Sequence, residues 1–234
     1  YNGGNINRPD EQVLDDTDRY GIEVALQLKE KFDAEVTVIS MGSLGTEKGI
    51  QQALQMGPDG ALVLEDDSLS GSNSLMTANV LSELSKKVEA DITIFGTEST
   101  DGYSGVIPQQ VSRMLGVPCI SYIKAVDIDE SVTLTRQTST GSEKVIMPSN
   151  CVLSVTAGGV EPRYPNFKDI MAAKSKPIER ISIADINYDA QQNLEFVDIK
   201  DVSTTKQGEK IIDEGEGFQI IIDKLKELKA IWKH

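Results

Sequence analysis

The sequence contains very little of what enzymes usually use for catalysis. The chain of 234 residues has one histidine, at position 234, which excludes an ordinary histidine-based acid, base or nucleophile-activating group. Its two cysteines, Cys119 and Cys151, each begin an apolar run, so we expect small buried side chains rather than a disulfide or metal pair. The phosphate-binding motifs G-x-G-x-x-G after a strand and G-x-x-x-x-G-K-[ST] are both absent.

Basic residues and long apolar runs are also scarce. Lys and Arg number 23 against 37 Asp and Glu, giving a net charge of −14, which argues against nucleic acid as a partner. No run of 18 apolar residues occurs, so we expect no direct membrane insertion. No signal peptide is visible, and we expect a reducing compartment: the cytoplasm, or the mitochondrial matrix if the source is eukaryotic.

Short apolar runs alternate with amphipathic segments along the chain. Strand-like runs occupy 36–40, 61–64, 92–95 and 119–123, and helix-like segments occupy 15–28, 46–56, 73–88 and 108–115. This alternation predicts a parallel sheet covered by helices. Near 125–148 strand-like runs follow one another without helices, which predicts an antiparallel hairpin before the chain returns to the sheet at Cys151–Val155.

The predicted fold is therefore α/β: a three-layer sandwich with a mostly parallel, nucleotide-binding, Rossmann-like sheet, a hairpin insertion and an extended C-terminal arm. We assign residues 1–182 to the α/β domain and 183–234 to the arm, and we expect 178 to about 205 to be irregular. A final helix over 217–232 carries one apolar stripe, formed by Phe218, Ile221, Ile222, Leu225, Leu228 and Trp232. Either another subunit or its own domain is expected to cover this stripe.

Two strands end in loops suited to a nucleotide, because open parallel sheets bind ligands beyond the carboxyl ends of their strands. The loops are 40–43 and 96–105, and the candidate residues are Met41, Gly42, Ser99, Thr100, Asp101, Ser104, Gly105 and Val106. Hydroxyl groups and the N–H groups at the start of the next helix suit a phosphate. Thr100 and Asp101 suit the ribose or the edge of adenine. A purely structural turn is the alternative.

Catalytic or metal-binding clusters are not expected. We interpret Glu65–Asp66–Asp67 as a solvated strand end rather than an acid–base pair, and Glu98 and Asp101 lack the partners that a metal site needs. The sequence thus indicates a nucleotide pocket without catalytic residues of its own, which suits a carrier subunit whose cofactor performs the chemistry.

A loop and short helix follow the strand Cys151–Val155. Gly158 and Gly159 let the backbone leave the strand, and we expect Val160 to be an exposed apolar side chain beside Glu161. Asn166 is suited to cap a helix over 167–173, whose end carries Lys174 and Lys176. Such a segment suits docking of another protein, although an ordinary surface loop has the same composition.

Two segments carry a resemblance to a known family. The run E-P-R-Y-P-N-F-K-D-I-M-A-A-K-S-K-P-I-E resembles a segment of the β subunits of electron-transfer flavoproteins, and G-T-E-S-T-D-G-Y-S-G falls in the expected order before it. The resemblance extends from about Leu14 to Trp232. It implies a heterodimer whose α subunit holds most of an FAD, while this chain closes one side of the flavin pocket near Thr17.

The same resemblance assigns further roles. It implies AMP as a structural ligand in the loop 96–105, and packing of the C-terminal arm on the α subunit. It also implies recognition of partner dehydrogenases by the segment that contains Gly159, Val160, Glu161, Arg163 and Tyr164.

The sequence departs from that family in several places. It lacks the initial strand, which we expect on a further N-terminal piece of the polypeptide, and it lacks the D-x-N-Q-T-G run of the nucleotide loop. Thr17 stands where some members have an aromatic residue. Three alternatives stay open: an electron-bifurcating member with a second FAD in place of AMP, a stand-alone adenine-nucleotide-binding protein of universal-stress type, and an ATP pyrophosphatase, whose S-G-G-x-D-S loop is missing.

Overall fold

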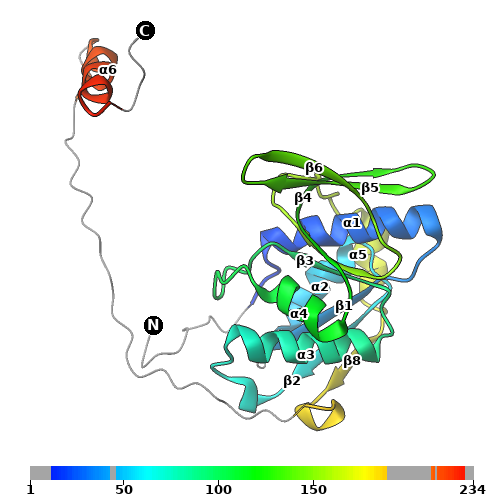
Figure 1. The fold of residues 1–234 in the computed structure, drawn as a ribbon. Coiled ribbons are helices and arrows are strands. Elements are labelled where there is room, and N and C mark those ends of the chain that lie inside the picture. Colours follow the sequence, from blue (N-terminus) through cyan, green and yellow to red (C-terminus); the bar gives the residue numbers. More distant parts are fainter. Residues whose placement is uncertain (1–11, 43–45, 189–211, 214, 230–234) are drawn as a thin grey trace. The chain divides into compact units, whose positions relative to one another are not determined.

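The computed structural model describes residues 12–42, 46–188, 212–213 and 215–229. The chain divides into two compact units, 1–197 and 198–234, which are described separately. The first unit has the predicted α/β architecture (Figure 1).

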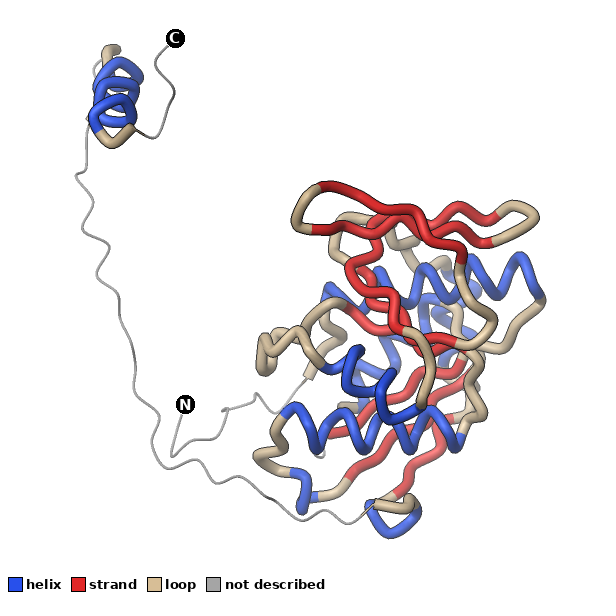
Figure 2. The backbone as a smooth tube through the Cα atoms, in the orientation of Figure 1, coloured by secondary structure: helices blue, strands red, loops and turns tan. Residues whose placement is uncertain are grey.

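The strands form two sheets rather than one. The three-stranded sheet has the order β1-β2-β8 and is wholly parallel; its strands are Thr37–Gly42, Gly60–Glu65 and Ile178–Ile181. The five-stranded sheet has the order β3-β7-β4-β5-β6; its strands are Ile92–Gly96, Cys151–Val155, Cys119–Ile128, Val132–Thr138 and Gly141–Ile146. In this second sheet, β3, β7 and the start of β4 are parallel, and β4, β5 and β6 form the predicted antiparallel ribbon, seen in red at the top of Figure 2.

The strand β8 corrects an expectation. Residues from 178 onward are predicted to be irregular, but Ile178–Ile181 pairs in register with β2. Its two isoleucines pack against the core on opposite sides of the sheet, while Glu179 and Arg180 are exposed. Four residues with two central charges give too weak an apolar pattern to be distinguished from a loop.

Local sequence signals place most of the helices. Asp15 caps α1, Asn73 caps α3 and Asn166 caps α5, each with its side chain accepting from backbone N–H groups of the first turn. The helices of the first unit are α1 (Asp16–Phe32), α2 (Glu47–Met56), α3 (Ser74–Lys87), α4 (Ile107–Leu115) and α5 (Phe167–Ala173), with short 3-10 turns η1 (Asp67–Leu69) and η2 (Ile183–Asp185).

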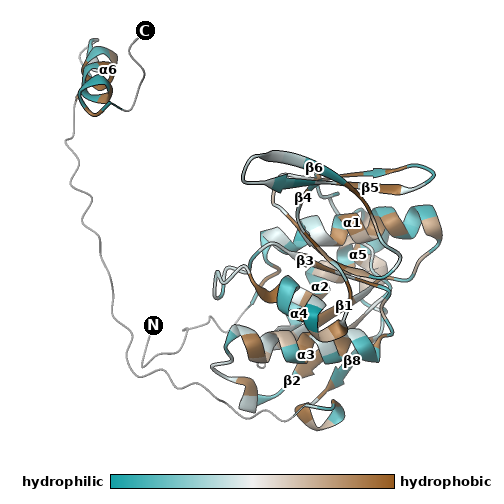
Figure 3. Ribbon diagram, in the orientation of Figure 1, coloured by the Kyte–Doolittle hydropathy of each residue, from teal (hydrophilic) through white to brown (hydrophobic). Residues whose placement is uncertain are grey.

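The helices bury both faces of the strands and so produce three layers. In the five-stranded sheet, Leu153 packs against α1, whereas its neighbour Val152 packs against α3 and α4. In the three-stranded sheet, Leu64 of β2 likewise packs against α3, and its neighbour Val63 packs against α2 and α5 on the opposite face. Figure 3 shows these strands as mainly hydrophobic between helices with mixed surfaces. This arrangement confirms the predicted α/β layers.

The second unit contains α6 (Gly217–Glu227). Several of its apolar side chains are exposed, namely Phe218, Ile220, Ile221 and the following Leu228. Trp232 and most of the predicted arm lie outside the described residues.

Candidate functional site

The candidate nucleotide loop, residues 96–105, leaves β3 at the carboxyl edge of the five-stranded sheet, and the start of α1 lies against it. One carboxylate joins the two. Asp15 accepts from Thr17 N and Oγ1 at 2.8 Å each through one oxygen, and from Thr100 N at 3.0 Å and Thr100 Oγ1 at 2.6 Å through the other. Burial opposes ionisation, but these hydrogen bonds outweigh it and lower the pKa of Asp15. Asp15 therefore fixes the loop conformation.

Gly96 allows α1 and the loop to approach closely. A Cβ atom at Gly96 would lie 3.1 Å from Thr17 Oγ1 and 3.2 Å from Asp18 Oδ1, and Thr17 Oγ1 also donates to the Glu98 carbonyl at 3.1 Å. The surrounding protein atoms and the charges of Asp15 and Asp101 raise the pKa of Asp18 to about 6, against a hydrogen bond from Gly96 N–H, although the residue as a whole is exposed to solvent. This corner of the site is thus strongly negative and suits hydroxyl donors such as a ribose.

The other end of the loop has a different character. Gly105 has a φ of 61°, a backbone conformation that favours glycine. Val106 precedes α4 and makes no side-chain cap, so the first N–H groups of this helix receive no hydrogen bond from that side chain. The Gln109 side-chain amide is oriented so that both its nitrogen and its oxygen form hydrogen bonds. The nitrogen then donates to the carbonyls of Gly105 and Val106, and the oxygen accepts from Ser121 Oγ at 3.0 Å. The helix start is therefore held in place. Pro108, at its second position, has no N–H group, so the N–H groups on either side of this proline are the ones suited to an anion.

The structure brings most of the candidate nucleotide residues together. Seven of them lie on the start of α1, on the loop after β3 or at the start of α4: Thr17, Ser99, Thr100, Asp101, Ser104, Gly105 and Val106. Met41 and Gly42 end β1 in the other sheet, where Met41 packs against the cluster around Leu64. Ser43 lies outside the described residues.

The acidic group after β2 has structural contacts. Glu65 accepts from Arg180 at 2.6 Å and from Thr46 at 3.1 Å. Asp66 caps η1 through Ser68 N at 2.9 Å and also accepts from Ile183 N at 3.1 Å. Glu65 and Asp66 therefore hydrogen-bond the end of β2 to neighbouring segments of the chain, so their role is structural and not only that of solvated surface carboxylates.

The candidate docking segment differs from expectation at Val160. Its side chain is half-buried and packs against the core cluster that contains Ile123 and Leu153, so the expectation of an exposed side chain is wrong. A Cβ atom at Gly159 would lie 2.6 Å from Lys124 Cα. The two glycines thus let the loop lie flat on β4, which turns Val160 inward.

Arg163 holds the segment to α1. Its backbone N and Nε donate to Glu23 Oε2 at 3.1 and 2.7 Å, Nη2 donates to Glu23 Oε1 at 3.0 Å, and Nη1 pairs with Glu30. The Glu23 side chain is only 5% exposed. Burial opposes its ionisation, but hydrogen bonds from Arg163 and Gln27 lower the pKa of Glu23. No pattern in the sequence identifies Glu23 as the partner of Arg163, since 140 residues separate them.

Anchoring of Arg163 leaves the next aromatic side chains at the surface. Tyr164 is 94% exposed, Phe167 78% and Met171 49%. Phe167 and Met171 are four residues apart on α5 and share one helix face. We call these three side chains the Tyr164 patch.

Within the part of the chain that the structure describes, no helix is long and apolar enough to cross a membrane. In the same part, no three or more His, Cys, Asp or Glu side chains form a group that could hold a metal ion.

Comparison with known proteins gives a consistent family. The family model described as Electron transfer flavoprotein domain matches residues 4–186. The chain is 35% identical over 234 residues to the electron transfer flavoprotein subunit beta of Mycobacterium leprae, covering 94% of this chain and 87% of that protein. It is 33% identical over 232 residues to the subunit beta of Mycobacterium tuberculosis strain H37Rv, with the same coverage. The subunit beta of Bacillus subtilis is 31% identical over 183 residues, covering 77% of this chain and 71% of that protein. The chain therefore belongs to the electron transfer flavoprotein family.

Proposed function

We propose that this chain is the β subunit of a heterodimeric electron-transfer flavoprotein. In this proposal it carries electrons between a dehydrogenase and an acceptor through an FAD held mainly by an α subunit, and it binds AMP as a structural ligand. The observation that carries the proposal is the loop after β3, which joins a carboxylate-rich corner to an open helix start. The relatives named above, all β subunits, support the same assignment.

The loop fits the parts of AMP by their chemistry. The uncapped start of α4, with Gly105 and the exposed Ser104, suits the phosphate. Asp101 and the hydroxyl groups nearby suit the ribose, since carboxylates accept hydrogen bonds from ribose hydroxyls. Asp15 and Thr100 position the loop through their mutual hydrogen bonds.

Redox chemistry belongs to the flavin when it is bound, because isoalloxazine accepts and releases the electrons. The start of α1 near Thr17 is the part of this chain that we assign to the closing wall of the flavin pocket. Thr17 Oγ1 is already committed to Asp15 and Glu98. Its role is therefore to fix the wall rather than to contact the flavin ring.

The α subunit is proposed to cover α6. Phe218, Ile221 and Leu228 give this helix an apolar surface of its own, and such surfaces mark protein contacts. The dehydrogenase is proposed to dock on the segment 159–164. In this segment Gly159, Val160 and Arg163 hold the loop, while Glu161 and Tyr164 face the partner.

The experiment is co-purification with the α subunit, followed by native mass measurement and analysis of released nucleotides. The proposal predicts a yellow heterodimer that releases close to one AMP and one FAD. Release of about two FAD and no AMP would instead identify an electron-bifurcating member. A colourless homodimer that retains an adenine nucleotide would identify the universal-stress type and overturn the proposal.

A further inference from the structure

Two tyrosines have a backbone conformation that is unusual for bulky side chains. Five non-glycine residues among those described have positive φ: Asp33, Glu89, Tyr103, Tyr122 and Lys229. Three of them follow the ends of α1, α3 and α6, where a left-handed residue is ordinary. Tyr103 and Tyr122, with φ of 47° and 62°, are not helix caps. For aromatic residues this conformation is an outlier, and such strain concentrates at functional sites.

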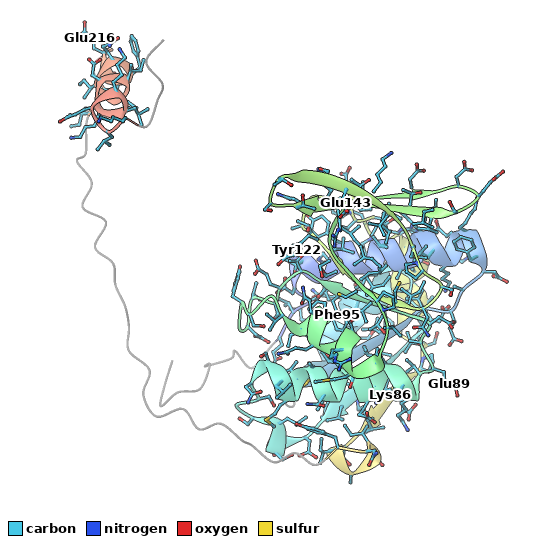
Figure 4. All side chains as sticks on the ribbon, in the orientation of Figure 1. Lys86, Glu89, Phe95, Tyr122, Glu143 and Glu216 are labelled. Atoms are coloured by element: carbon cyan, nitrogen blue, oxygen red, sulfur yellow. The ribbon has the colours of Figure 1, made fainter. Side chains whose placement is uncertain are left out.

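Tyr122 lies at the carboxyl edge of the parallel strands. The pairing of β4 with β7 shifts register between Ile120 and Ile123, which brackets Tyr122. Ile123 then lies opposite Val155, and Val155 lies opposite Gly96. Tyr122 therefore sits at the edge from which the nucleotide loop departs, and its side chain is 45% exposed (labelled in Figure 4).

Hydrogen bonds hold this bulge on both sides. Tyr122 N donates to Ser154 Oγ at 3.1 Å, and the Ile123 carbonyl accepts from Thr156 N at 2.8 Å. Ser154 is a buried polar residue in a strand that is otherwise apolar. A buried hydroxyl is costly unless it is hydrogen-bonded. The hydrogen bond from Tyr122 N satisfies the Ser154 hydroxyl and so offsets the cost of burying it. Bulges of this kind redirect a side chain next to a ligand site.

Tyr103 belongs to the nucleotide loop itself. Its N–H donates to the Ser99 carbonyl at 3.0 Å, which closes a turn, and its side chain is 65% exposed. Gly105 follows two positions later, and Val106 then precedes α4. The strained turn thus presents an aromatic ring beside the region assigned to the phosphate and ribose.

We propose that Tyr103 and Tyr122 bind the adenine ring of the nucleotide by stacking. This inference rests on the proposed function, which supplies a nucleotide at this edge. The carboxylates and the start of α4 account for the ribose and phosphate, whereas a planar base needs an aromatic or apolar surface. Both AMP and FAD contain adenine, so the same side chains serve either ligand.

The test measures AMP and FAD binding to the co-purified heterodimer after its adenine nucleotide has been removed. Tyr122→Ala and Tyr103→Ala should each weaken binding at least about fivefold, whereas the Tyr→Phe variants should retain it because the ring remains. Ser154→Ala should weaken binding by releasing the bulge. Phe32→Ala, which removes an aromatic side chain of comparable exposure (51%) at the C-terminal end of α1, is the matched control and should bind nucleotide as the unmodified protein does.

Tyr122→Gly separates binding from folding. Glycine adopts positive φ without steric strain, so the nucleotide-free protein should keep its melting temperature while nucleotide affinity falls. If Tyr103→Ala and Tyr122→Gly bind nucleotide as tightly as the unmodified protein, the stacking role is wrong. If the unmodified heterodimer binds neither nucleotide, the proposed site fails and the stacking role fails with it.

Discussion

Three carboxylates on α1 and its N-cap show how neighbours determine the behaviour of identical chemical groups. Hydrogen bonds lower the pKa of Asp15 and of Glu23 despite burial, so ionisation of both is favoured by folding. Asp18 lies close to Asp15 and Asp101 and has its pKa raised to about 6. The first two therefore stabilise the folded protein at neutral pH, whereas Asp18 destabilises it. Unfavourable charge of this kind is common where a site is shaped for a ligand.

Replacement of Asp18 should stabilise the protein at neutral pH. A folded pKa of about 6, above the ordinary 3.8, means that the folded state binds more protons between these values, so stability falls as the pH rises through this window. Asp18→Asn should raise the free energy of unfolding by about 1 kcal/mol at pH 8, a value reduced for solvent screening, and by much less at pH 4. Urea denaturation at both pH values measures the difference.

Asp16→Asn is the matched control, because Asp16 is an exposed acid in the same helical turn. Its effect should be small and opposite in sign, through the helix dipole. Equal effects of the two variants, or a gain at pH 4 as large as that at pH 8, would contradict the role assigned to Asp18.

Arg163 should contribute more to the free energy of unfolding than is usual for a partly exposed arginine. Arg163→Ala leaves the buried Glu23 carboxylate without its bidentate partner and should cost roughly 2–3 kcal/mol, less than for a fully buried pair. Glu30→Ala removes only the exposed partner and should cost below about 1 kcal/mol. The Glu23 contribution is present above its ordinary pKa of 4.5 and is lost as the pH falls through its lowered folded value.

Chemical denaturation of Arg163→Ala, Glu30→Ala and the double variant Arg163→Ala with Glu23→Gln tests this prediction. The double variant should recover part of the loss, because the neutral amide is less costly to bury than an unpaired charge. A loss below about 0.5 kcal/mol in Arg163→Ala would show that the pair does not hold the segment.

At the scale of elements, local signals are more predictable than long-range contacts. The apolar period predicts a helix over 73–88, and α3 spans Ser74–Lys87 with Asn73 as its cap. The position of the loop after β3 could be predicted because glycine, hydroxyl and acidic residues follow an apolar strand, whereas its binding of a nucleotide stays a prediction. The bulge at Tyr122 and the inward turn of Val160 could not, since both depend on contacts between β4 and distant residues. The same limit applies to the pairing of Glu23 with Arg163.

The two glycines of the docking loop should differ in their tolerance of a side chain. At Gly159 a Cβ atom would meet the Lys124 backbone at 2.6 Å, which cannot move cheaply. Gly158 has a φ of 78° but nothing within 4 Å of the added atom. Gly158→Ala should therefore cost about 1 kcal/mol through backbone strain, and Gly159→Ala about 2 kcal/mol or more through the added clash.

Thermal and urea denaturation of the two variants gives the comparison. Hydrogen exchange of the Thr156 amide, which bonds the Ile123 carbonyl at 2.8 Å, reports whether the loop has lifted from β4. If Gly159→Ala were as stable as Gly158→Ala and kept this amide protected, the close packing of the loop on β4 would be wrong.

At the scale of the whole molecule, the charge and apolar character of the surface around the Tyr164 patch indicate what kind of partner could dock there. The chain carries a net charge of −14, yet the Tyr164 patch is accompanied by the exposed Lys168 and Lys174. An apolar patch with basic residues beside it suits a partner pocket with acidic residues at its rim. Since Val160 packs inward and Arg163 is paired, the exposed aromatic side chains replace Val160 as the expected anchor.

Docking of the dehydrogenase should therefore depend on Tyr164 and Phe167. Replacement of both by alanine should lower kcat/KM for electron transfer from the dehydrogenase about tenfold or more, because two large apolar side chains no longer become buried on binding. The melting temperature should stay nearly constant, since both side chains are already exposed in the free protein. Val160→Ala should do the reverse: it should lower stability by about 1 kcal/mol through its core contacts and leave electron transfer nearly unchanged.

Leu75→Ala supplies the control, because Leu75 is another exposed apolar side chain and lies in the first turn of α3, rather than on the docking segment or on α1, which Arg163 contacts. The basic side chains give a second, independent measure: kcat/KM should fall as ionic strength rises, and Lys168→Gln with Lys174→Gln should flatten that dependence. If the Tyr164 and Phe167 double variant transferred electrons at the normal rate while Val160→Ala did not, the anchor would lie in the glycine loop. The packing of Val160 against Ile123 would then have to be released on binding, which exchange at the Thr156 amide would detect directly.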